Sequence, residues 1–296
     1  MSAQKWKSDR LQPLITIGLS VYNGEATLAC AVQSVIAQSY QEWELVLIDD
    51  GSCDASLEVA RTFTDQRIVV VSDSGNRGLA SRLNQAIRMA RGKYFCRMDQ
   101  DDIAFPNRLE RQLEFLEEHL AVDLVASSVV VFRNDGSLSG VLEVPESHLE
   151  ICRRPWNGFY LPHPTWMGRT EWFLAHPYTS QADGVEDQFL LYSTCRESRF
   201  GGIPEVLLGY REHRRLLRKN FWKRILFWRV IGSGAIKQGH WIDLFMLCIA
   251  QPLKIAGDVF NAALGIDRTW NGLGAVSPLM NKVWLNVWRG LSQHEL

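Results

Sequence analysis

Apolar runs of strand length alternate with runs of helical periodicity over the first 132 residues. The expected strands cover 14–21, 43–50, 67–72, 93–98 and 123–132. The expected helices cover 27–38, 55–64, with Asp54 as the N-cap, 78–92, ending at Gly92, and 106–119. A further helix with an acidic start is expected beyond this region, over 183–195. Strands alternating with helices of this length indicate βαβ units and a parallel sheet covered on both faces. In such sheets, ligands bind beyond the carboxyl ends of the strands.

Three aspartates follow the fourth expected strand in the segment FCRMDQDDIAFPNRL: Asp99, Asp101 and Asp102. Like charges this close repel one another, so folding alone disfavours the arrangement. One interpretation is a solvated loop in which Asp102 caps the next helix. The other is a site for Mg²⁺ or Mn²⁺, because these cations prefer oxygen ligands and bridge phosphates.

Polar side chains also follow the first two expected strands. Asp49 and Asp50 end the second strand, and Ser20 and Tyr22 end the first. The carboxyl ends of parallel strands meet at one edge, so we expect these residues to lie beside the aspartates of the fourth strand. The chain has no GxGxxG after the first strand and no GxxxxGK[ST], which removes the main support for dinucleotide and P-loop sites.

Several segments occur in the order found in one known family. LSVYNGE, SVIAQSYQEWELVLIDDGSCD, GLASRLNQAIRMARGKYFCRMDQDDIAFPNRLERQ and GVEDQFLL resemble the family 2 glycosyltransferases, over about residues 13–215. The resemblance implies an α/β fold of GT-A type, with a mixed, mostly parallel sheet flanked by helices. It also implies transfer of a sugar from a nucleotide diphosphate.

The resemblance assigns donor-binding roles by position. Ser20, Tyr22 and Asp50 match residues that cradle the nucleotide base. Asp101 would bind the metal that bridges the two phosphates, and Asp99 would lie near the ribose or the water shell of the metal. The implied cofactor is therefore Mn²⁺ or Mg²⁺.

The resemblance also assigns the reaction chemistry. Asp187 matches the catalytic base, with its neighbour Glu186 as the alternative, and N-terminal helix acidity is the structural explanation for both. Arg211 and His213 match a motif near the diphosphate. Inverting transfer needs one carboxylate to remove the proton of the acceptor hydroxyl and a cation to stabilise the leaving diphosphate.

Three further residues have two open interpretations each. His163, in LPHPTW, either touches the diphosphate or acceptor, or is a structural histidine in a proline-rich turn. Arg82 and Asn84, in the helix after NRG, either face the nucleotide or belong to a solvated helix face.

Charge divides the chain into two regions. Residues 1–210 have a balance of −9 and residues 211–296 a balance of +8, and six of the eleven tryptophans lie in the second region. We therefore expect a catalytic domain over 1–215 and a basic, Trp-rich helical region over 216–296. Basic amphipathic helices with aromatic residues can lie in a membrane interface, here an anionic one; packing on the catalytic domain or a dimer interface is the alternative.

The location expected from the sequence is the cytoplasm, with peripheral attachment to the inner membrane face. The six cysteines form no CxxC pair, which fits a reducing compartment. The N-terminal apolar run, about eight residues long, leads to YNGE rather than a cleavage site, so we expect a strand there. No window approaches the roughly 18 apolar residues of a spanning helix.

The leading functional hypothesis is a metal-dependent inverting glycosyltransferase of the hexosyltransferase class. We expect a UDP-sugar as donor, and as acceptor a saccharide or polyprenyl-linked saccharide hydroxyl in surface polysaccharide synthesis. No nucleic-acid partner is expected. The alternative is a non-catalytic module that binds a nucleotide sugar or a partner on the same fold.

Overall fold

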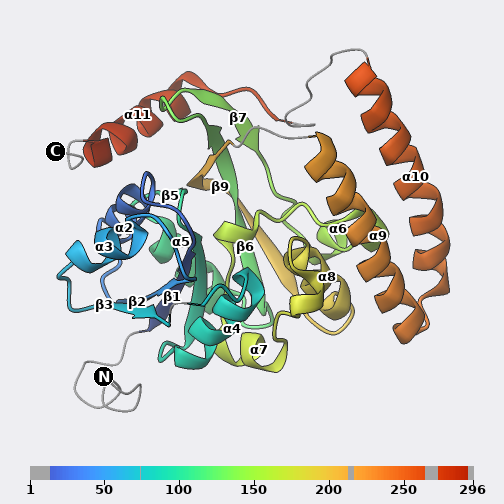
Figure 1. The fold of residues 1–296 in the computed structure, drawn as a ribbon, viewed down its shortest axis with the longest axis horizontal. Helices are drawn as coiled ribbons and strands as arrows, with labels where there is room; N and C mark the ends of the chain where they lie inside the picture. The colour runs from blue at the N-terminus through green and yellow to red at the C-terminus, as the bar shows by residue number, and fades with distance from the viewer. Residues whose placement is uncertain (1–13, 74, 213–216, 264–272, 293–296) are drawn as a thin grey trace.

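A mixed sheet of nine strands crosses the molecule (Figure 1). The structure is a computed structural model that describes residues 14–73, 75–212, 217–263 and 273–292. The strand order is β3-β2-β1-β4-β8-β6-β9-β5, and β7 pairs with β6. The strands are β1 (Ile15–Val21), β2 (Trp43–Asp49), β3 (Ile68–Ser72), β4 (Tyr94–Asp99), β5 (Ile103–Ala104), β6 (Leu124–Phe132), β7 (Leu138–Leu142), β8 (Met167–Arg169) and β9 (Phe200–Arg211).

The pairing pattern confirms the expected fold class. Strands β3, β2, β1 and β4 are parallel, and β6 is parallel to β9. The short strand β8 separates β4 from β6 and is antiparallel to both, and β5 and β7 are also antiparallel to their partners. The sheet is therefore mixed and mostly parallel, and β6 is not the direct neighbour of β4 that a simple run of βαβ units would make it.

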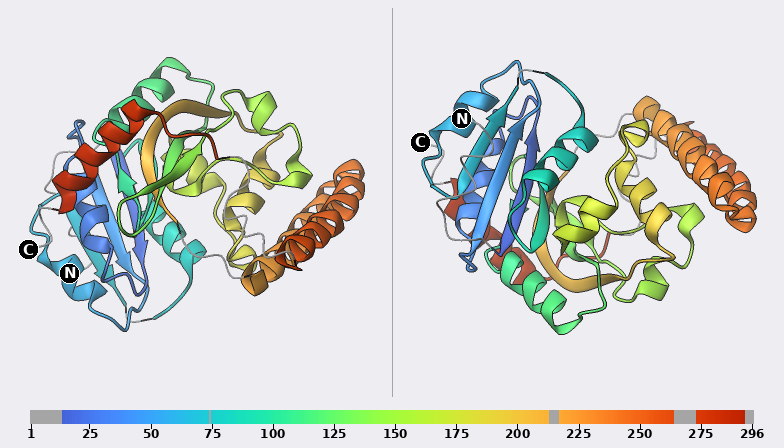
Figure 2. Two further views of the ribbon diagram at one scale, coloured as in Figure 1. Left: turned by 90° about the horizontal axis from the view of Figure 1, so that it is seen from above. Right: turned by 90° about the horizontal axis from the view of Figure 1, so that it is seen from below.

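Helices cover both faces of the sheet (Figures 1 and 2). Helices α2, α3 and α5 pack on one face, and α4, α7, α8 and α9 contribute to the core on the other. The helices are α2 (Leu28–Ile36), α3 (Ser56–Thr62), α4 (Leu79–Met89), α5 (Arg108–Glu118), α6 (His148–Ile151), α7 (Thr170–Ala175), α8 (Glu186–Thr194), α9 (Leu217–Gln238), α10 (Trp241–Ala263) and α11 (Pro278–Ser292). Three single turns of 3-10 helix are η1 (Pro155–Asn157), η2 (His163–Thr165) and η3 (Ser180–Ala182).

Strand β2 explains why its segment is a continuous apolar run. Side chains alternate between the two faces of a strand. Trp43, Leu45 and Leu47 lie in the core beneath α2, and Val46 and Ile48 lie in the core on the side of α4. Both faces are buried, which is the pattern of a central parallel strand.

The expected C-cap of α4 is wrong. The helix ends at Ala90 rather than at Gly92. A Cβ atom on Gly92 would lie 2.6 Å from the backbone nitrogen of Thr16, so this glycine permits close approach to β1. Packing against a neighbouring strand, not helix termination, accounts for it.

Two expected helix starts are also displaced. The N-cap position of α3 is Ala55, one residue after the expected Asp54. The Asp54 carboxylate still accepts the backbone N–H of Ser56, at 3.0 Å. The helix expected from residue 183 begins at Glu186. Asp183 instead accepts a hydrogen bond from the backbone N–H of Ala80, at 3.3 Å.

The C-terminal helices contact the sheet at two separate places. Helix α9 adds Phe227, Ile231 and Ala235 to the core beside α8, and α10 lies on the outer side of α9 (Figure 1). Helix α11 covers the opposite end, where Trp284 is buried against Phe132 with ring centroids 4.7 Å apart. Within the described residues, no helix is both long and apolar enough to cross a membrane.

Candidate active site

The carboxyl ends of β1, β2 and β4 lie side by side, which confirms the expected shared edge. In the parallel registers, Ser20 is the partner of Asp99, and Val21 is the partner of Asp49. The backbone N–H of Asp50 donates to the carbonyl of Val21 at 2.8 Å. The polar residues after all three strands therefore open onto one edge of the sheet.

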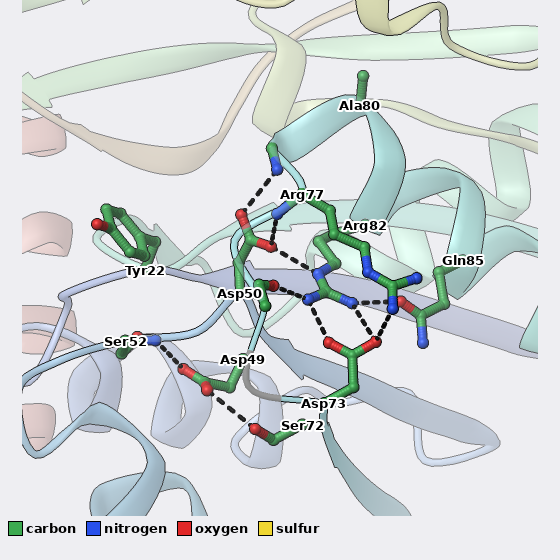
Figure 3. A network of polar contacts seen from close by, with 12 residues as sticks. Tyr22, Asp49, Asp50, Ser52, Ser72, Asp73, Arg77, Ala80, Arg82 and Gln85 are labelled. Carbon is green, nitrogen blue, oxygen red and sulfur yellow. Dashed lines mark hydrogen bonds and ion pairs between the residues drawn. The ribbon is translucent and has the colours of Figure 1, made fainter.

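Asp50 accepts hydrogen bonds from three groups on the segment that leads into α4 (Figure 3). Its Oδ1 accepts from the backbone N–H of Arg77 at 2.7 Å and from Nε of Arg82 at 2.7 Å, and its Oδ2 accepts from the backbone N–H of Gly78 at 3.0 Å. The completely buried Arg82 side chain also pairs with Asp73 at 2.6 Å, and this hydrogen bond lowers the pKa of Asp73 to about 2. Asp50 therefore orders the loop at the expected nucleotide edge.

Two residues shape the turn between β2 and α3: Asp49, which Figure 3 labels, and Gly51. Asp49 accepts from the backbone N–H of Ser52 at 3.2 Å and from the hydroxyl of Ser72 at 3.1 Å. Gly51 has a φ of 75°, and a Cβ atom there would lie 3.0 Å from backbone atoms of Gly75 and Asn76. The turn therefore requires glycine, which accounts for the DDGS segment in physical terms.

The segment Asp99–Asp101 is tied to the strands around it. Arg97 pairs with both carboxylate oxygens of Asp99, at 2.8 and 2.5 Å. The side chain of Gln100 accepts the backbone N–H of Tyr22 at 2.7 Å and donates to the carbonyl of Tyr22 at 3.3 Å. The Tyr22 side chain is exposed at this edge. A hydrogen-bonded pair thus joins the end of β1 to the aspartate loop.

Asp99, Asp101 and Asp102 form a cluster of three carboxylates. One oxygen from each lies within 4.8 Å of the others. Asp102 does not cap α5, whose N-cap is Asn107; it is buried, and its Oδ1 accepts the backbone N–H of Arg211 at 2.9 Å. Burial, followed by the charges of Asp101 and Asp99, raises the pKa of Asp102 well above its usual value.

The donor set of this cluster fits a divalent cation. Carboxylate oxygens are the ligands that Mg²⁺ and Mn²⁺ prefer. Among the described residues, the buried Oδ2 of Asp102 has no hydrogen-bond partner, and a buried acceptor without a partner is costly. A bound cation would satisfy that oxygen and offset the mutual repulsion of the three carboxylates.

A pocket of about 610 Å³ opens beside this cluster. It lies between the end of β4, the segment 159–164, the start of α8 and α9. Its lining includes Asp99, His163, Glu186, Asp187 and Lys223. The structure therefore brings one member of the aspartate cluster and both candidate bases into a single pocket.

Glu186 and Asp187 have different surroundings within the pocket. Glu186 is buried and accepts the backbone N–H of Gly184 at 2.6 Å, and burial followed by the charge of Asp187 raises its pKa. Asp187 is half-buried, and its Oδ2 accepts from the side-chain amide of Gln188 at 2.9 Å. Both lie in the first turn of α8, where the helix dipole favours negative charge.

His163 is buried at the back of the same pocket. Its Nε2 lies 2.8 Å from the hydroxyl of Tyr178, and its Nδ1 lies 3.9 Å from Oε1 of Glu186. Burial, followed by the nearby charge of Arg97, lowers the pKa of His163 well below its usual value. The imidazole is therefore neutral at pH 7. It packs beside the Glu186 carboxyl group in the lining of the pocket.

Arg211, the last residue of β9, contacts the loop that carries the three aspartates. Its Nε donates to the carbonyl of Asp101 at 2.8 Å, its Nη1 donates to Oδ1 of Asn134 at 3.2 Å, and the guanidinium lies over the ring of Phe132. Its contact with a diphosphate stays a prediction. His213 lies outside the described residues.

The structure gives Asn84 a structural role and adds two residues that the sequence analysis missed. Asn84 exchanges hydrogen bonds of 2.7 and 2.9 Å with the backbone of Tyr178, so it braces the pocket wall. The missed residues are Gln100 and Arg97. Arg97 had a readable signal: in RMD, the arginine and the aspartate are two positions apart on a strand and so share a face.

Known proteins share both the sequence pattern and the fold. EpsE of Bacillus subtilis is 39% identical over 127 residues, which cover 42% of this chain and 46% of EpsE. S. aureus TarS 1-349, solved in complex with UDP-GlcNAc, superposes with a TM-score of 0.64 at 16% identity, covering 94% of this chain and 80% of TarS 1-349. The mannosyltransferase PcManGT of Pyrobaculum calidifontis, solved with GDP-Man and Mn²⁺, gives a TM-score of 0.60 at 15% identity, covering 99% of this chain and 86% of PcManGT.

The match to EpsE spans less than half the length of that relative. At these identities the structural likenesses show the fold alone, and that fold is of GT-A type. Residues 16–175, more than half of the chain, match the family described as Glycosyl transferase family 2. This chain belongs to glycosyl transferase family 2.

Proposed function

We propose that this protein is a metal-dependent, inverting glycosyltransferase. In this proposal it moves a sugar from a nucleoside diphosphate donor, a UDP-sugar, to a hydroxyl of a saccharide or lipid-linked saccharide in surface polysaccharide synthesis. The observation that carries the proposal is the pocket of about 610 Å³, which Asp99 and Asp187 both line. One comes from the end of β4 and the other from the start of α8, which supports a proposed donor site and a proposed base that share one pocket.

The proposed base is Asp187. Its half-buried carboxylate can accept a proton from an acceptor hydroxyl as that oxygen attacks the anomeric carbon. The bond between that carbon and the diphosphate oxygen breaks as the new glycosidic bond forms, so one displacement inverts the configuration and needs no covalent intermediate. Glu186 is less suited because it is buried and already accepts a backbone N–H.

The proposed metal ligand is Asp101, with Asp99 and Asp102 beside it. A divalent cation there would supply positive charge to the leaving diphosphate. Arg97 holds Asp99 in place, and Arg211 holds the backbone of Asp101. These two arginines therefore fix the loop before any substrate binds.

The proposed donor contacts lie on the neighbouring strand ends. Tyr22 presents an exposed ring, and Ser20 lies beside Asp99 in the sheet. A nucleoside can therefore lie between the Tyr22 ring and the end of β4. Asp50 keeps its proposed role at the base and also holds the loop before α4. Support for a nucleotide-sugar donor comes from TarS and PcManGT, which were solved with UDP-GlcNAc and GDP-Man.

The test is release of nucleoside diphosphate from a panel of UDP- and GDP-sugars with Mn²⁺, using the full chain. We expect release from at least one donor, and its loss in Asp101→Asn and Asp187→Asn. Glu118→Gln is the control, because Glu118 is an exposed carboxylate at the end of α5 and is not one of the residues that line the pocket.

Two results would contradict the proposal. Donor binding with no release from any donor, with or without saccharide acceptors, would indicate a non-catalytic nucleotide-sugar module. Full release by the metal-stripped protein in EDTA would exclude the role given to Asp101.

A further inference from the structure

Helix α10 differs from an ordinary surface helix, because its apolar side faces away from the protein and its polar side faces toward it. Every exposed side chain that the structure describes on it, through residue 261, is nonpolar. These are Trp241, Ile242, Phe245, Cys248, Ile249, Pro252, Leu253, Ala256, Val259 and Phe260. Their spacing of three and four residues places them on one side of the helix, which we call the outer face of α10.

The polar residues of α10 point toward the protein. Gln251 and Asp243 are buried, whereas Phe245 and Leu253 are 64% and 67% exposed. The three charged side chains each contact another element: Asp243 pairs with Arg196, Lys254 donates to the carbonyl of Asn157 at 2.8 Å, and Asp258 pairs with Arg224. Folding of this chain therefore uses the polar side of α10 and leaves the apolar side uncovered, which marks an interaction surface.

The charges on α9, the helix that packs beside α10, indicate what kind of surface can cover the outer face. The exposed charged residues described on α9 are all basic: Lys223, Arg229 and Lys237. The two acidic side chains described on this helix pair are both in ion pairs: Asp243 is buried beside Arg196, and Asp258, 38% exposed, pairs with Arg224. Trp222, near the start of α9, and Trp241, at the start of α10, are exposed at opposite ends of the antiparallel helix pair, and tryptophan is enriched where a protein meets lipid headgroups. Basic and aromatic residues around an apolar face are complementary to anionic lipid.

A second copy of this chain fits the same surface less well. A two-fold dimer would place the outer face against itself and bring the two basic margins together. That approach carries like-charge repulsion, and both acidic groups described on the two helices are already paired within the chain. Anionic lipid headgroups would instead be attracted to the basic residues of α9.

We propose that the outer face of α10 docks on an anionic membrane, with the helix lying in the plane of the interface. Figure 2 shows that α9 and α10 lie side by side at the edge of the molecule, so a flat surface can reach α10. Lys223 of α9 lines the pocket that also contains Asp187. Docking therefore holds the pocket close to the lipid surface, and this step, which rests on the proposed function, specifies a lipid-linked acceptor.

The test is co-sedimentation of the full chain with vesicles. One set contains phosphatidylglycerol and phosphatidylcholine, and the other contains phosphatidylcholine alone. We expect binding to the anionic set, weakened by high salt. The partition coefficient should fall about tenfold or more for Phe245→Ser/Leu253→Ser, because each substitution removes a large apolar side chain that docking would bury in the lipid. The matched control is Leu120→Ser/Leu149→Ser, which changes two exposed leucines outside the C-terminal helices.

Truncation of the C-terminal region is a poor substitute for these variants, because it would uncover the core to which Ile231 of α9 belongs. Circular dichroism and the unfolding midpoint show whether the α10 variant remains folded. A second measurement uses the parent protein: brominated phosphatidylglycerol should quench its tryptophan fluorescence, and Trp241→Phe should reduce that quenching.

Four outcomes decide the matter. Absence of binding to anionic vesicles at low salt overturns the proposal, as does equal binding by the α10 variant and the leucine control. A dimer in light scattering that the α10 variant converts to a monomer, without vesicle binding, assigns the face to a second copy instead. Retained nucleoside diphosphate release by the α10 variant without vesicles shows that docking and donor chemistry are separate properties, so either can fail without the other.

Discussion

Asp50 and Arg82 form a buried ion pair, with Nε of Arg82 2.7 Å from Oδ1 of Asp50. The pair joins the end of β2 to the second turn of α4, and the same carboxylate accepts the backbone N–H groups of Arg77 and Gly78. A residue expected to meet the nucleotide base thus also has a structural role. Loss of either partner should therefore affect stability before it affects chemistry.

Arg82→Met should destabilise the protein strongly. The substitution leaves Asp50 buried without its cation, and breaking a buried pair typically costs about 3–5 kcal/mol. Denaturant unfolding followed by circular dichroism measures the effect. Arg77→Ala is the matched control, because its pair with Asp73 is on the surface, with 58% of the Arg77 side chain exposed, and it should change the unfolding midpoint little. Equal midpoints for Arg82→Met and the parent would show that the pair contributes nothing.

Asp101→Asn should abolish sugar transfer and leave the fold intact. The substitution removes the proposed metal ligand, and it also removes one charge from a cluster whose oxygens lie within 4.8 Å of one another. The thermal midpoint of the metal-free protein should stay the same or rise, because repulsion is relieved. EDTA should inhibit the parent enzyme reversibly, and added Mn²⁺ should restore activity. Unchanged transfer by Asp101→Asn would move the metal site elsewhere.

Asp187→Asn should reduce turnover by about 10²–10⁴-fold, which is the usual worth of general-base assistance. Donor affinity should change little, because the proposed base acts on the acceptor. Glu186→Gln is the comparison that separates the two carboxylates: it should retain more activity, since Glu186 is buried and accepts the N–H of Gly184. The reverse order of the two variants in single-turnover assays would assign the base to Glu186.

His163 should make the protein less stable as the pH falls below its unfolded pKa of about 6.5. Burial lowers the folded-state pKa of His163, so the unfolded chain binds more protons between that value and 6.5. The free energy of unfolding should fall through this window by up to about 1.4 kcal/mol per pH unit. His163→Gln should flatten the profile, and His119→Gln, at an exposed site, should retain the slope of the parent.

Trp284→Ala should destabilise the sheet end that α11 covers. The indole is completely buried, its Nε1 donates to the carbonyl of Gly136 at 2.7 Å, and removing a core tryptophan typically costs about 3–5 kcal/mol. Leu279→Ala, at a residue of the same helix that is 72% exposed, is the control. Similar unfolding midpoints for both variants would indicate that α11 is peripheral to the fold.

The parallel half of the sheet could be predicted because its signals are local. Each strand from β1 to β4 is an apolar run with polar residues directly after it, and chain connectivity alone brings those ends together. Strand β8 could not be predicted in this way. Its three residues, Met167–Arg169, are too few to show a period, and they become a strand only because β4 and β6 pair with them.

The candidate site also divides into residues with a local sequence signal and residues whose placement depends on distant segments. Asp99, Asp101 and Asp187 could be proposed as site residues because each belongs to a short segment with a recognisable order. The burial of Asp102 could not, because it depends on the pairing of β5 with β9, which places the N–H of Arg211 beside it from 109 residues away. The helical nature of α10 could be predicted from its spacing, but its orientation depends on contacts with α9 and η1.

Gln100 links the two parts of the proposed donor site. Its side chain forms hydrogen bonds with both the N–H and the carbonyl of Tyr22. The residue expected at the nucleotide base is therefore held directly to the loop expected at the cation. Ordering one end lowers the entropy left to lose at the other. We therefore expect nucleotide and cation to bind with positive cooperativity, and linkage requires the factor by which each improves the affinity of the other to be the same.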